Sequence, residues 1–409
     1  MKNIFAVALG VLTAIGGFVD IGDLVTNAVV GSRFGLGLAW VVLVGVVGIC
    51  VYAQMSGRVA AVSGRATFEI IRERLGPRAG LANLAASFLI NLLTVTAEVG
   101  GVALALQLAT SVDPGWWVPV AAFGVWIVIW RARFELLENV TGLLGLTLIV
   151  FAVALFMLSP DWGELAGQAL QPGPPADEPV ATYWFYAVAL FGAAMTPYEV
   201  FFFSSGAIEE KWTEKDLAKS RLNVLVGFPL GGLLSIAIAG CAAVVLLPAA
   251  IDVTSLSQVV LPVAEAGGKI ALSFVIVGIL AATFGAALET TLSSGYTLAQ
   301  YFGWSWGKFR KPAKAARFHL SMIVCLLIAV AILATGVDPI LVTEYSVVFS
   351  AVALPLTYLP ILVIANDREY MGDRVNGRGM NFVGQVYLVI ILAAALAAIP
   401  LLIITGAGA

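Results

Sequence analysis

Two aspartates stand in the middle of the first apolar stretch of this sequence. The segment GGFVDIGDLVTNAVVGS, residues 16–32, carries Asp20 and Asp23 with glycines close by, at Gly17 and Gly22. A carboxylate at membrane depth costs at least ~2.5 kcal/mol, so it must face the interior of a helix bundle, take up a proton or hold a cation. Glycine lowers helix propensity. We therefore expect the helix to unwind at Asp20–Asp23 and the two carboxylates to bind a cation.

A second anomaly lies in the sixth apolar segment, FGAAMTPYEVFFFSSGAI, residues 191–208. Pro197 interrupts its middle and Glu199 follows two residues later. Proline removes a backbone donor and leaves carbonyls free one turn earlier, near Ala193 and Ala194. Freed carbonyls and half-helix ends coordinate cations inside membranes, and carboxylates supply the negative charge. The pattern predicts a mid-membrane cation site that joins Glu199 and the Ala193 region to the two aspartates.

Three more acids fall inside apolar segments. Glu98 lies in VTAEVGG, Glu289 in LETTLSS and Glu344 in LVTEYSVV. Glu289 and Glu344 stand alone, and the simplest interpretation is that each is a neutral acid with a structural hydrogen bond. For Glu98 the structural and the functional interpretation stay open.

The composition indicates an integral membrane protein. Of the 409 residues 60% are hydrophobic and 11% charged, whereas a soluble domain has ~25% charged residues. Apolar stretches recur along the whole chain, so residues 4–19 begin a first span rather than a cleaved signal peptide. Cys50, Cys241 and Cys325 show no spacing typical of a disulfide framework or a zinc site. No soluble domain is left to assign.

Apolar windows between charges predict eleven transmembrane helices. They cover residues 4–32, 35–57, 80–109, 115–130, 135–158, 182–208, 220–248, 269–301, 316–336, 341–365 and 382–405. Of the 22 Lys and Arg residues, all but Arg33 and Lys269 then fall on the side of the N-terminus. The positive-inside rule places the N-terminus in the cytoplasm and the C-terminus outside. Residues 159–181 form an acidic, proline-rich external connector, and 67–75 lie along the inner surface.

The two interruptions fall in the first and the sixth span. These are corresponding positions in two five-span halves, which indicates inverted repeats around a central site. We expect one transmembrane transporter domain over residues 1–409, with repeat one at about 1–158, repeat two at about 182–365 and an extra span at about 382–405.

These residues resemble a known family. DIGDLVTNAVVGSRFGLGLAWVVL, residues 20–43, is similar to the first span of the Nramp (natural-resistance-associated macrophage protein) divalent-metal transporters, which carries D-P-G-N and a G-S-x-F-G-Y-x-L-L-W-like stretch. The segment around Thr196 resembles the family's A-x-M-P-H segment. The resemblance covers nearly the whole chain. It implies the LeuT-type fold, an all-α membrane fold with broken helices 1 and 6, and a metal bound between their unwound parts.

The departures from the family pattern have a chemical direction. Asp23 replaces the family's asparagine, Thr196 its methionine and Tyr198 its histidine, while Met195 stands one residue from the usual place of the sulfur ligand. A local shift in register could restore that thioether. The acidic pair of the third span is represented by Glu98 alone. Carboxylate and hydroxyl oxygens favour Mg²⁺, Ca²⁺ or Mn²⁺, whereas sulfur favours transition metals.

The predicted metal ligands are thus Asp20, Asp23, Ala193, Thr196 and Glu199, with Glu98, Tyr198 and Met195 in possible coupling or neighbouring roles. We expect a transporter, not an enzyme, that carries Mg²⁺ or Mn²⁺ as its substrate, with weak or no proton coupling and no cofactor. The resemblance also extends to a divergent Nramp-related branch that carries Mg²⁺.

An alternative is a LeuT-type transporter of an organic cation or amino-acid-like amine. Aromatic residues near the second interruption would form its binding cage: Trp184, Tyr186, Tyr198, Phe201, Phe202 and Phe203. For either function we expect a monomer in the lipid bilayer of a bacterial cytoplasmic membrane, with no nucleic-acid partner.

Overall fold

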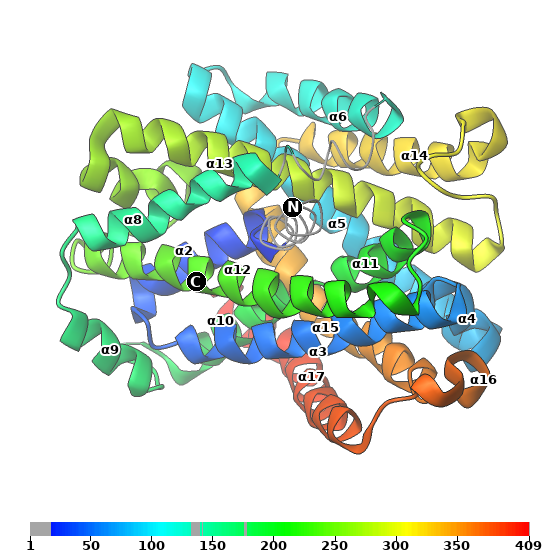
Figure 1. The fold of residues 1–409 in the computed structure, drawn as a ribbon. Coiled ribbons are helices and arrows are strands. Elements are labelled where there is room, and N and C mark those ends of the chain that lie inside the picture. The colour runs from blue at the N-terminus through cyan, green and yellow to red at the C-terminus, as the bar shows by residue number, and fades with distance from the viewer. Residues whose placement is uncertain (1–17, 132–139, 141, 176–177, 409) are drawn as a thin grey trace.

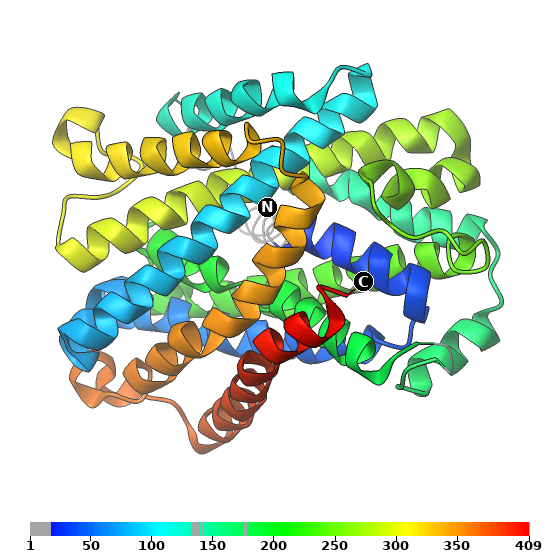
Figure 2. The ribbon, with the colours of Figure 1, turned by 180° about the vertical axis from the view of Figure 1, so that it is seen from behind.

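The chain folds into a bundle of α-helices, shown in Figure 1 and from behind in Figure 2. The computed structural model describes residues 18–131, 140, 142–175 and 178–408, and within these ranges it has no β-strand. The first part of the first predicted span, residues 4–17, lies outside the described residues. The all-α fold predicted from the sequence is confirmed.

The helices follow one another along nearly the whole chain. They are α2 (Ile21–Phe34), α3 (Ala39–Ser63), α4 (Thr67–Leu75), α5 (Pro77–Thr110), α6 (Pro114–Arg131), α8 (Val150–Met157), α9 (Trp162–Leu170), α10 (Val180–Ala194), α11 (Pro197–Glu209), α12 (Leu217–Val245), α13 (Leu256–Phe302), α14 (Ala316–Leu333), α15 (Pro339–Ile364), α16 (Arg368–Met371) and α17 (Arg378–Thr405). Short 3-10 turns are η1 (Leu146–Ile149), η2 (Glu214–Asp216), η3 (Pro312–Lys314) and η4 (Gly372–Arg374).

Length and hydropathy alone select fewer spans than the eleven predicted. Eight helices of the described part are long and apolar enough to cross a membrane, with α10 and α11 counted together, or nine if the pair around α8 and α9 is one bent span. Helix α2 has 14 residues and is only the second half of its predicted span. The predicted span at 269–301 agrees with α13 after its kink at Gly268, where φ is +61°.

The two connecting segments, residues 67–75 and 159–181, both contain a helix. Helix α4 lies where residues 67–75 were expected on the surface, with Phe68, Ile70 and Ile71 buried and Glu73 exposed. The predicted external connector is more ordered than its prolines suggested, because α9 forms within it. Asp161 caps α9 by accepting hydrogen bonds from the backbone N–H groups of residues 163 and 164.

The helix contacts repeat between the two halves of the chain. Helix α5 packs on α6 and α14, and α13 packs on α14 and α6 in the same manner. Likewise α2 lies against α12 and α11 lies against α3, while α5 and α13 cross each other and α3 and α12 do the same. This is the pairing that two inverted five-span repeats produce. The residue bounds of the repeats stay a prediction.

Both predicted interruptions are present at the centre of the bundle. Helix α10 ends at Ala194 and α11 begins at Pro197, so the sixth span is broken as predicted. In the first span Val19 and Asp20 are non-helical, but the helix resumes at Ile21. The expected unwinding over Asp20–Asp23 is therefore shorter, because the Asp20 side chain caps a new helix and Asp23 already lies within it.

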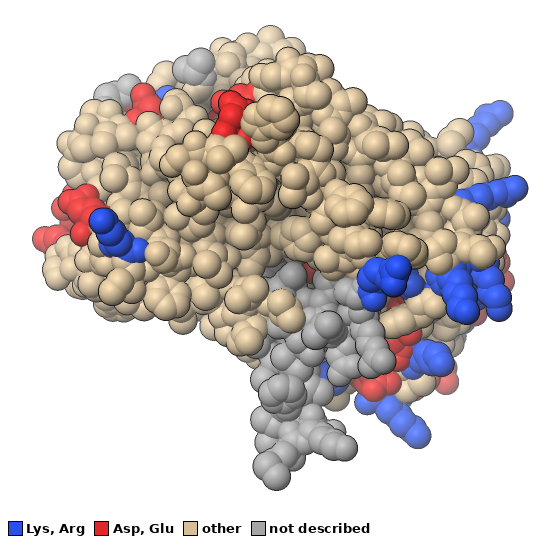
Figure 3. All heavy atoms as spheres, turned by 90° about the horizontal axis from the view of Figure 1, so that it is seen from above, with Lys and Arg blue, Asp and Glu red and all other residues tan. Residues whose placement is uncertain are grey.

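Charges gather at opposite ends of the bundle. Figure 3 shows Lys and Arg concentrated at the end where α4 and α16 lie, with mostly Asp and Glu at the other end. The basic end carries exposed residues of α4, α16 and the loop before α14, among them Arg72, Arg74, Arg310, Lys311, Lys314 and Arg368. Residues near the C-terminus lie away from this end (Figure 1).

Candidate metal centre

Asp20 is the N-cap of α2. Its Oδ1 accepts a hydrogen bond from the Asp23 backbone N–H at 2.8 Å, which satisfies one of the free donors at the helix start. Its Oδ2 lies 3.5 Å from the Tyr198 hydroxyl, which donates to it. The capping role fixes the carboxylate at the break of the first span although the side chain is 96% inaccessible to solvent, with a relative exposure of 4%.

The break between α10 and α11 follows from its sequence. Pro197 takes the first position of α11, where the missing N–H has no consequence, and Thr196 is the residue before it. The Thr196 hydroxyl donates to the Ala193 carbonyl at 3.4 Å. Two residues after Ala193, the Met195 carbonyl accepts a hydrogen bond from the Tyr358 hydroxyl of α15 at 3.2 Å. The backbone that follows α10 is thus non-helical, and these two hydrogen bonds hold it in place.

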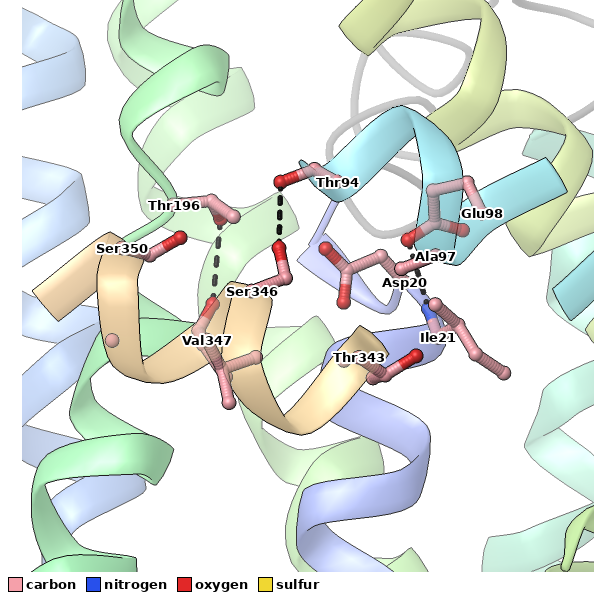
Figure 4. A pocket seen from close by; sticks show the side chains of 13 residues that line it. Asp20, Ile21, Thr94, Ala97, Glu98, Thr196, Thr343, Ser346, Val347 and Ser350 are labelled. Atoms are coloured by element: carbon pink, nitrogen blue, oxygen red, sulfur yellow. Dashed lines mark hydrogen bonds between the residues drawn. The ribbon is translucent and has the colours of Figure 1, made fainter. Parts of the chain in front are cut away.

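A small cavity lies between these two breaks, α5 and α15. Its lining comprises Asp20, Ile21, Gly22, Thr94, Ala97, Glu98, Gly192, Ala193, Thr196, Thr343, Ser346, Val347 and Ser350. Its volume is about 10 Å³, which is room for about one water molecule. Figure 4 shows Asp20 and Glu98 near one another and the hydroxyl of Thr94 paired with that of Ser346, at 3.0 Å.

Every polar side chain that lines this cavity presents oxygen. Two are carboxylates, those of Asp20 and Glu98, and the others are hydroxyls. Among the described residues no basic, sulfur-containing or aromatic side chain takes part in the lining. Oxygen donors with two negative charges are the ligand set that hard divalent cations prefer.

Glu98 is held by the same half-helix as Asp20. Its Oε1 accepts a hydrogen bond from the Ile21 backbone N–H at 3.2 Å, and its side chain is fully buried. Its Oε2 is buried without a hydrogen-bond partner among the described residues. An orphaned carboxylate oxygen at a cavity wall is costly unless something such as a cation or a proton satisfies it.

Two predicted ligands lie outside this lining. The Asp23 carboxylate turns to the other side of α2, where it accepts hydrogen bonds from Ser235 of α12 and from Asn27, the latter at 2.9 Å. Glu199, in the first turn of α11, is buried, and its Oε2 has no hydrogen-bond partner among the described residues. Over the described ranges no three His, Cys, Asp or Glu side chains come close enough to hold one metal together. That Asp23 and Glu199 bind the ion stays a prediction.

Met195 does not supply the sulfur ligand in this structure. Its side chain is fully buried, and its sulfur packs where Gly48 of α3 leaves space, next to Tyr387 of α17. Thr196 therefore faces the cavity at the position where the family has methionine. No shift in register has moved the thioether into the lining.

The proposed aromatic cage does not surround the cavity. Phe201 packs on Phe68, Phe203 on Trp212, and Trp184 on Trp40. Of the aromatic residues predicted for the cage, Tyr198 is joined to the lining by its hydrogen bond to Asp20, and none of the six is itself part of the described lining.

The sequence predicted the Thr196 hydroxyl but not the other four hydroxyl groups of the lining. Thr343, Ser346 and Ser350 project from one face of α15, and Thr94 stands one turn before Glu98 on α5. The spacing of three and four residues along α15 was visible in the sequence and is the signal that could have found them.

Comparison with known proteins agrees with this arrangement. The family model described as "Natural resistance-associated macrophage protein-like" matches residues 10–400. The chain belongs to the Nramp family. Its curated relatives include the divalent metal cation transporter MntH of Deinococcus radiodurans, which is 27% identical over 392 residues, covering 92% of this chain and 85% of the relative.

Solved structures show the same fold. The manganese transporter of Eremococcus coleocola, in complex with an aromatic bis-isothiourea compound, superposes with a TM-score of 0.67 at 18% identity over 98% of this chain and 94% of the other. MhsT in complex with L-phenylalanine gives 0.61 at 16% identity, with 95% and 98% covered. This Nramp-family chain therefore has the LeuT-type fold. It is an integral membrane transporter, not an enzyme, and a metal ion is its substrate rather than a cofactor.

Proposed function

We propose that this transporter carries divalent metal cations, with Mg²⁺ and Mn²⁺ as its preferred substrates, through the cavity between the two broken helices. The observation that carries this proposal is that every polar side chain of the lining presents oxygen. Two of these side chains are carboxylates, and one carboxylate has an oxygen without a hydrogen-bond partner among the described residues. The ligands would be Asp20, Thr196 and the Ala193 carbonyl, with Glu98 close by. Asp23 and Glu199 would join them in another conformation of the cycle.

The displacement of Met195 supports the preference for hard ions. With the thioether packed against α3, a soft cation such as Cd²⁺ finds no sulfur in the lining. The hydroxyls of Thr94, Thr343, Ser346 and Ser350 can take the place of some of the water ligands that Mg²⁺ would otherwise retain. The small space favours an ion with few waters in this conformation.

An organic cation is less well supported. The cavity holds about one water molecule, and no described aromatic side chain lines it. An aromatic cage that binds an amine needs aromatic faces around a larger space. We keep this alternative only as the second arm of the experiment below.

We further propose that proton coupling is weak or absent. His319 is the single histidine of the chain, and it lies near the basic end, where its Nε2 contacts the Arg310 carbonyl at 3.2 Å. Glu98 and Asp20 therefore have no histidine beside them to pass a proton onward. With the basic end in the cytoplasm, as the positive-inside rule favours, an inside-negative potential contributes ~4.6 kcal/mol per 100 mV to a divalent ion that crosses the whole field.

Uptake into proteoliposomes tests these proposals. A tracer of Mn²⁺ is competed with Mg²⁺, Ca²⁺, Cd²⁺ and a panel of amines, and a trapped dye reports internal pH. We expect competition by Mg²⁺, little by Cd²⁺ or amines, and no change in pH. Competition by amines alone would reject a metal substrate, while acidification that requires the metal would reject uncoupled transport.

A further inference from the structure

A second pocket lies in line with the central cavity. It is lined by Val25, Thr26, Val29, Phe185, Tyr186, Ala189, Glu344, Val347 and Val348, which belong to α2, α10 and α15. We call it the outer pocket. Val347 lines both this pocket and the central cavity, so the two spaces adjoin at this residue.

The outer pocket is on the side away from the basic end. Helices α2 and α10 both meet the central cavity with one end, α2 by its first residues and α10 by its last. The pocket is lined by residues that lie one to three turns away from these ends: Val25 and Val29 of α2, and Phe185 and Ala189 of α10. An ion that moves between the acidic end and the central cavity along these half-helices meets this pocket first.

Glu344 is the only charged side chain among the described residues of this lining. It is half-buried, and no described residue donates a hydrogen bond to its carboxylate. The remaining walls are mostly apolar, which strengthens the field of this charge within the pocket. A structural neutral acid, the simplest interpretation of the sequence, would be expected to have a hydrogen-bond partner.

The positive charge of Arg33, beside this pocket, is already neutralised. Arg33, at the end of α2, forms a two-point ion pair with Glu178, with Nε–Oε1 2.8 Å and Nη2–Oε2 3.1 Å, and also donates to the Gly408 carbonyl. The Tyr186 ring, which lines the pocket, stacks under this guanidinium at 5.3 Å. The Glu344 charge therefore has no cation of the protein to pair with among these neighbours.

The partition at Val347 is tightly built. A methyl group placed on Gly22 would come within 2.8 Å of the Val347 Cγ1, and one on Gly192 within 2.3 Å of its carbonyl oxygen. Glycines of α2 and of α10 thus allow both half-helices to close on the same residue of α15. Separation of these helices would join the outer pocket to the central cavity.

The outer pocket in this structure has a volume of about 10 Å³, which is room for about one water molecule. We propose that it widens into a loading site when α2 and α10 separate, at which Glu344 holds a partly hydrated divalent cation before the ion passes Val347 to the central cavity. This inference rests on the proposed function. It assigns to Glu344 a role in capture and none in holding the ion at the centre. Loss of its charge then lowers apparent affinity for external ions and leaves the maximal rate intact.

Transport kinetics provide the first test. Glu344→Gln is compared with wild type and with the control Glu265→Gln, which removes an exposed acid in the first part of α13. We expect the KM for external Mn²⁺ to rise about tenfold in Glu344→Gln, the lower end of the range by which local charge changes association rates, with an unchanged maximal rate. Glu344→Asp, which retains the charge, should show a smaller rise, and Glu265→Gln should behave as wild type.

Direct binding of Mn²⁺ separates this site from the central one. In Asp20→Ala we expect a weak residual site in electron paramagnetic resonance titrations, which disappears in Asp20→Ala/Glu344→Gln and persists in Asp20→Ala/Glu265→Gln. Thermal unfolding of each purified variant establishes that it is folded.

The outcomes that overturn the loading site differ from those that overturn the function. An unchanged KM in Glu344→Gln, or a folded Glu344→Gln without any transport, rejects the loading site while Asp20 variants remain inactive. Wild-type transport by an Asp20 variant rejects the proposed function itself.

Discussion

The exchange of Asp20 for asparagine separates its structural role from its proposed role as a ligand. Asparagine caps a helix as well as aspartate does, and its side-chain oxygen can accept the same bond from the Asp23 N–H. The amide nitrogen would then face the cavity and the Tyr198 hydroxyl. Asp20→Asn thus retains the start of α2 and replaces a negative charge by a neutral donor, whereas Asp20→Ala removes both the cap and the charge.

The expected loss of affinity follows from the charge alone. A unit charge and a divalent ion about 4 Å apart interact by ~8 kcal/mol at an effective dielectric constant of ~20. If the amide oxygen of asparagine and the water that reaches the site replace roughly three quarters of this attraction, ~2 kcal/mol remains, or about a 30-fold weaker binding. The stability cost of Asp20→Asn should be a few tenths of a kcal/mol, while Asp20→Ala should lose ~1 kcal/mol.

Two measurements on the same preparations check this. Isothermal titration with Mn²⁺ reports affinity, and unfolding in detergent reports stability. We expect both variants to lose binding to a similar degree and only Asp20→Ala to be clearly less stable. Asp20→Asn with wild-type affinity would show that the carboxylate is no ligand and serves only as a helix cap.

Three further changes address other parts of the molecule. Asp23→Asn should leave the affinity for Mn²⁺ measured by titration close to that of wild type, because in this structure the carboxylate faces Ser235 and not the cavity, but it should slow uptake, because Asp23 is proposed to join the ligands in another conformation of the cycle; wild-type uptake by this variant would show that Asp23 is no ligand. Gly192→Ala places a methyl group 2.3 Å from the Val347 carbonyl, so it should disfavour this closed state by ~1–3 kcal/mol and raise cysteine labelling of positions in the outer pocket; unchanged labelling would refute the steric argument. The pKa of Asp367 is lowered below its ordinary value of 3.8 by a backbone N–H and by an arginine of α4. The ionised Asp367 thus stabilises the fold fully above pH ~4, and this effect is lost as the pH falls through the lowered pKa. Wild type should therefore lose more thermal stability than Asp367→Asn between pH 6 and pH 3. Equal losses would show that Asp367 makes no such contribution.

Hydropathy and local chemistry were enough to predict most helices and both breaks. Pro197 forced the second break, since it lacks the donor that a continuous helix needs. The sequence predicted the position of the first break correctly but overestimated its length. The spacing of Asp20 and Asp23 permits an N-cap followed by a helix start, and this local signature of a helix N-terminus competes with the glycines that suggested unwinding.

The ligand set was harder to predict, because the direction of a side chain depends on partners far along the chain. Asp23 is turned by Ser235, more than 200 residues away. The place of Met195 depends on a glycine of α3 that makes room for its sulfur. Neither contact leaves a mark in the local sequence. The hydroxyls of α15 do leave one, a polar stripe at helical spacing, and a search for such stripes alongside charges would have found the third wall of the cavity.

The central carboxylates are balanced by one half-helix. Asp20 caps the N-terminus of α2 and Glu98 accepts its first free N–H, so both lie at the end of the helix that carries a partial positive charge of about one half. This partial charge offsets only part of the two negative charges, so a cation or protons must neutralise the remainder. The cavity thus retains a net preference for a positive ion. If α2 were to move away from α5, Glu98 would lose its N–H partner and the site would bind the ion differently. The hydrogen bond from Ile21 to Glu98 therefore connects the position of the first broken helix to the affinity of the centre, as a carrier that must both take up and release its substrate requires.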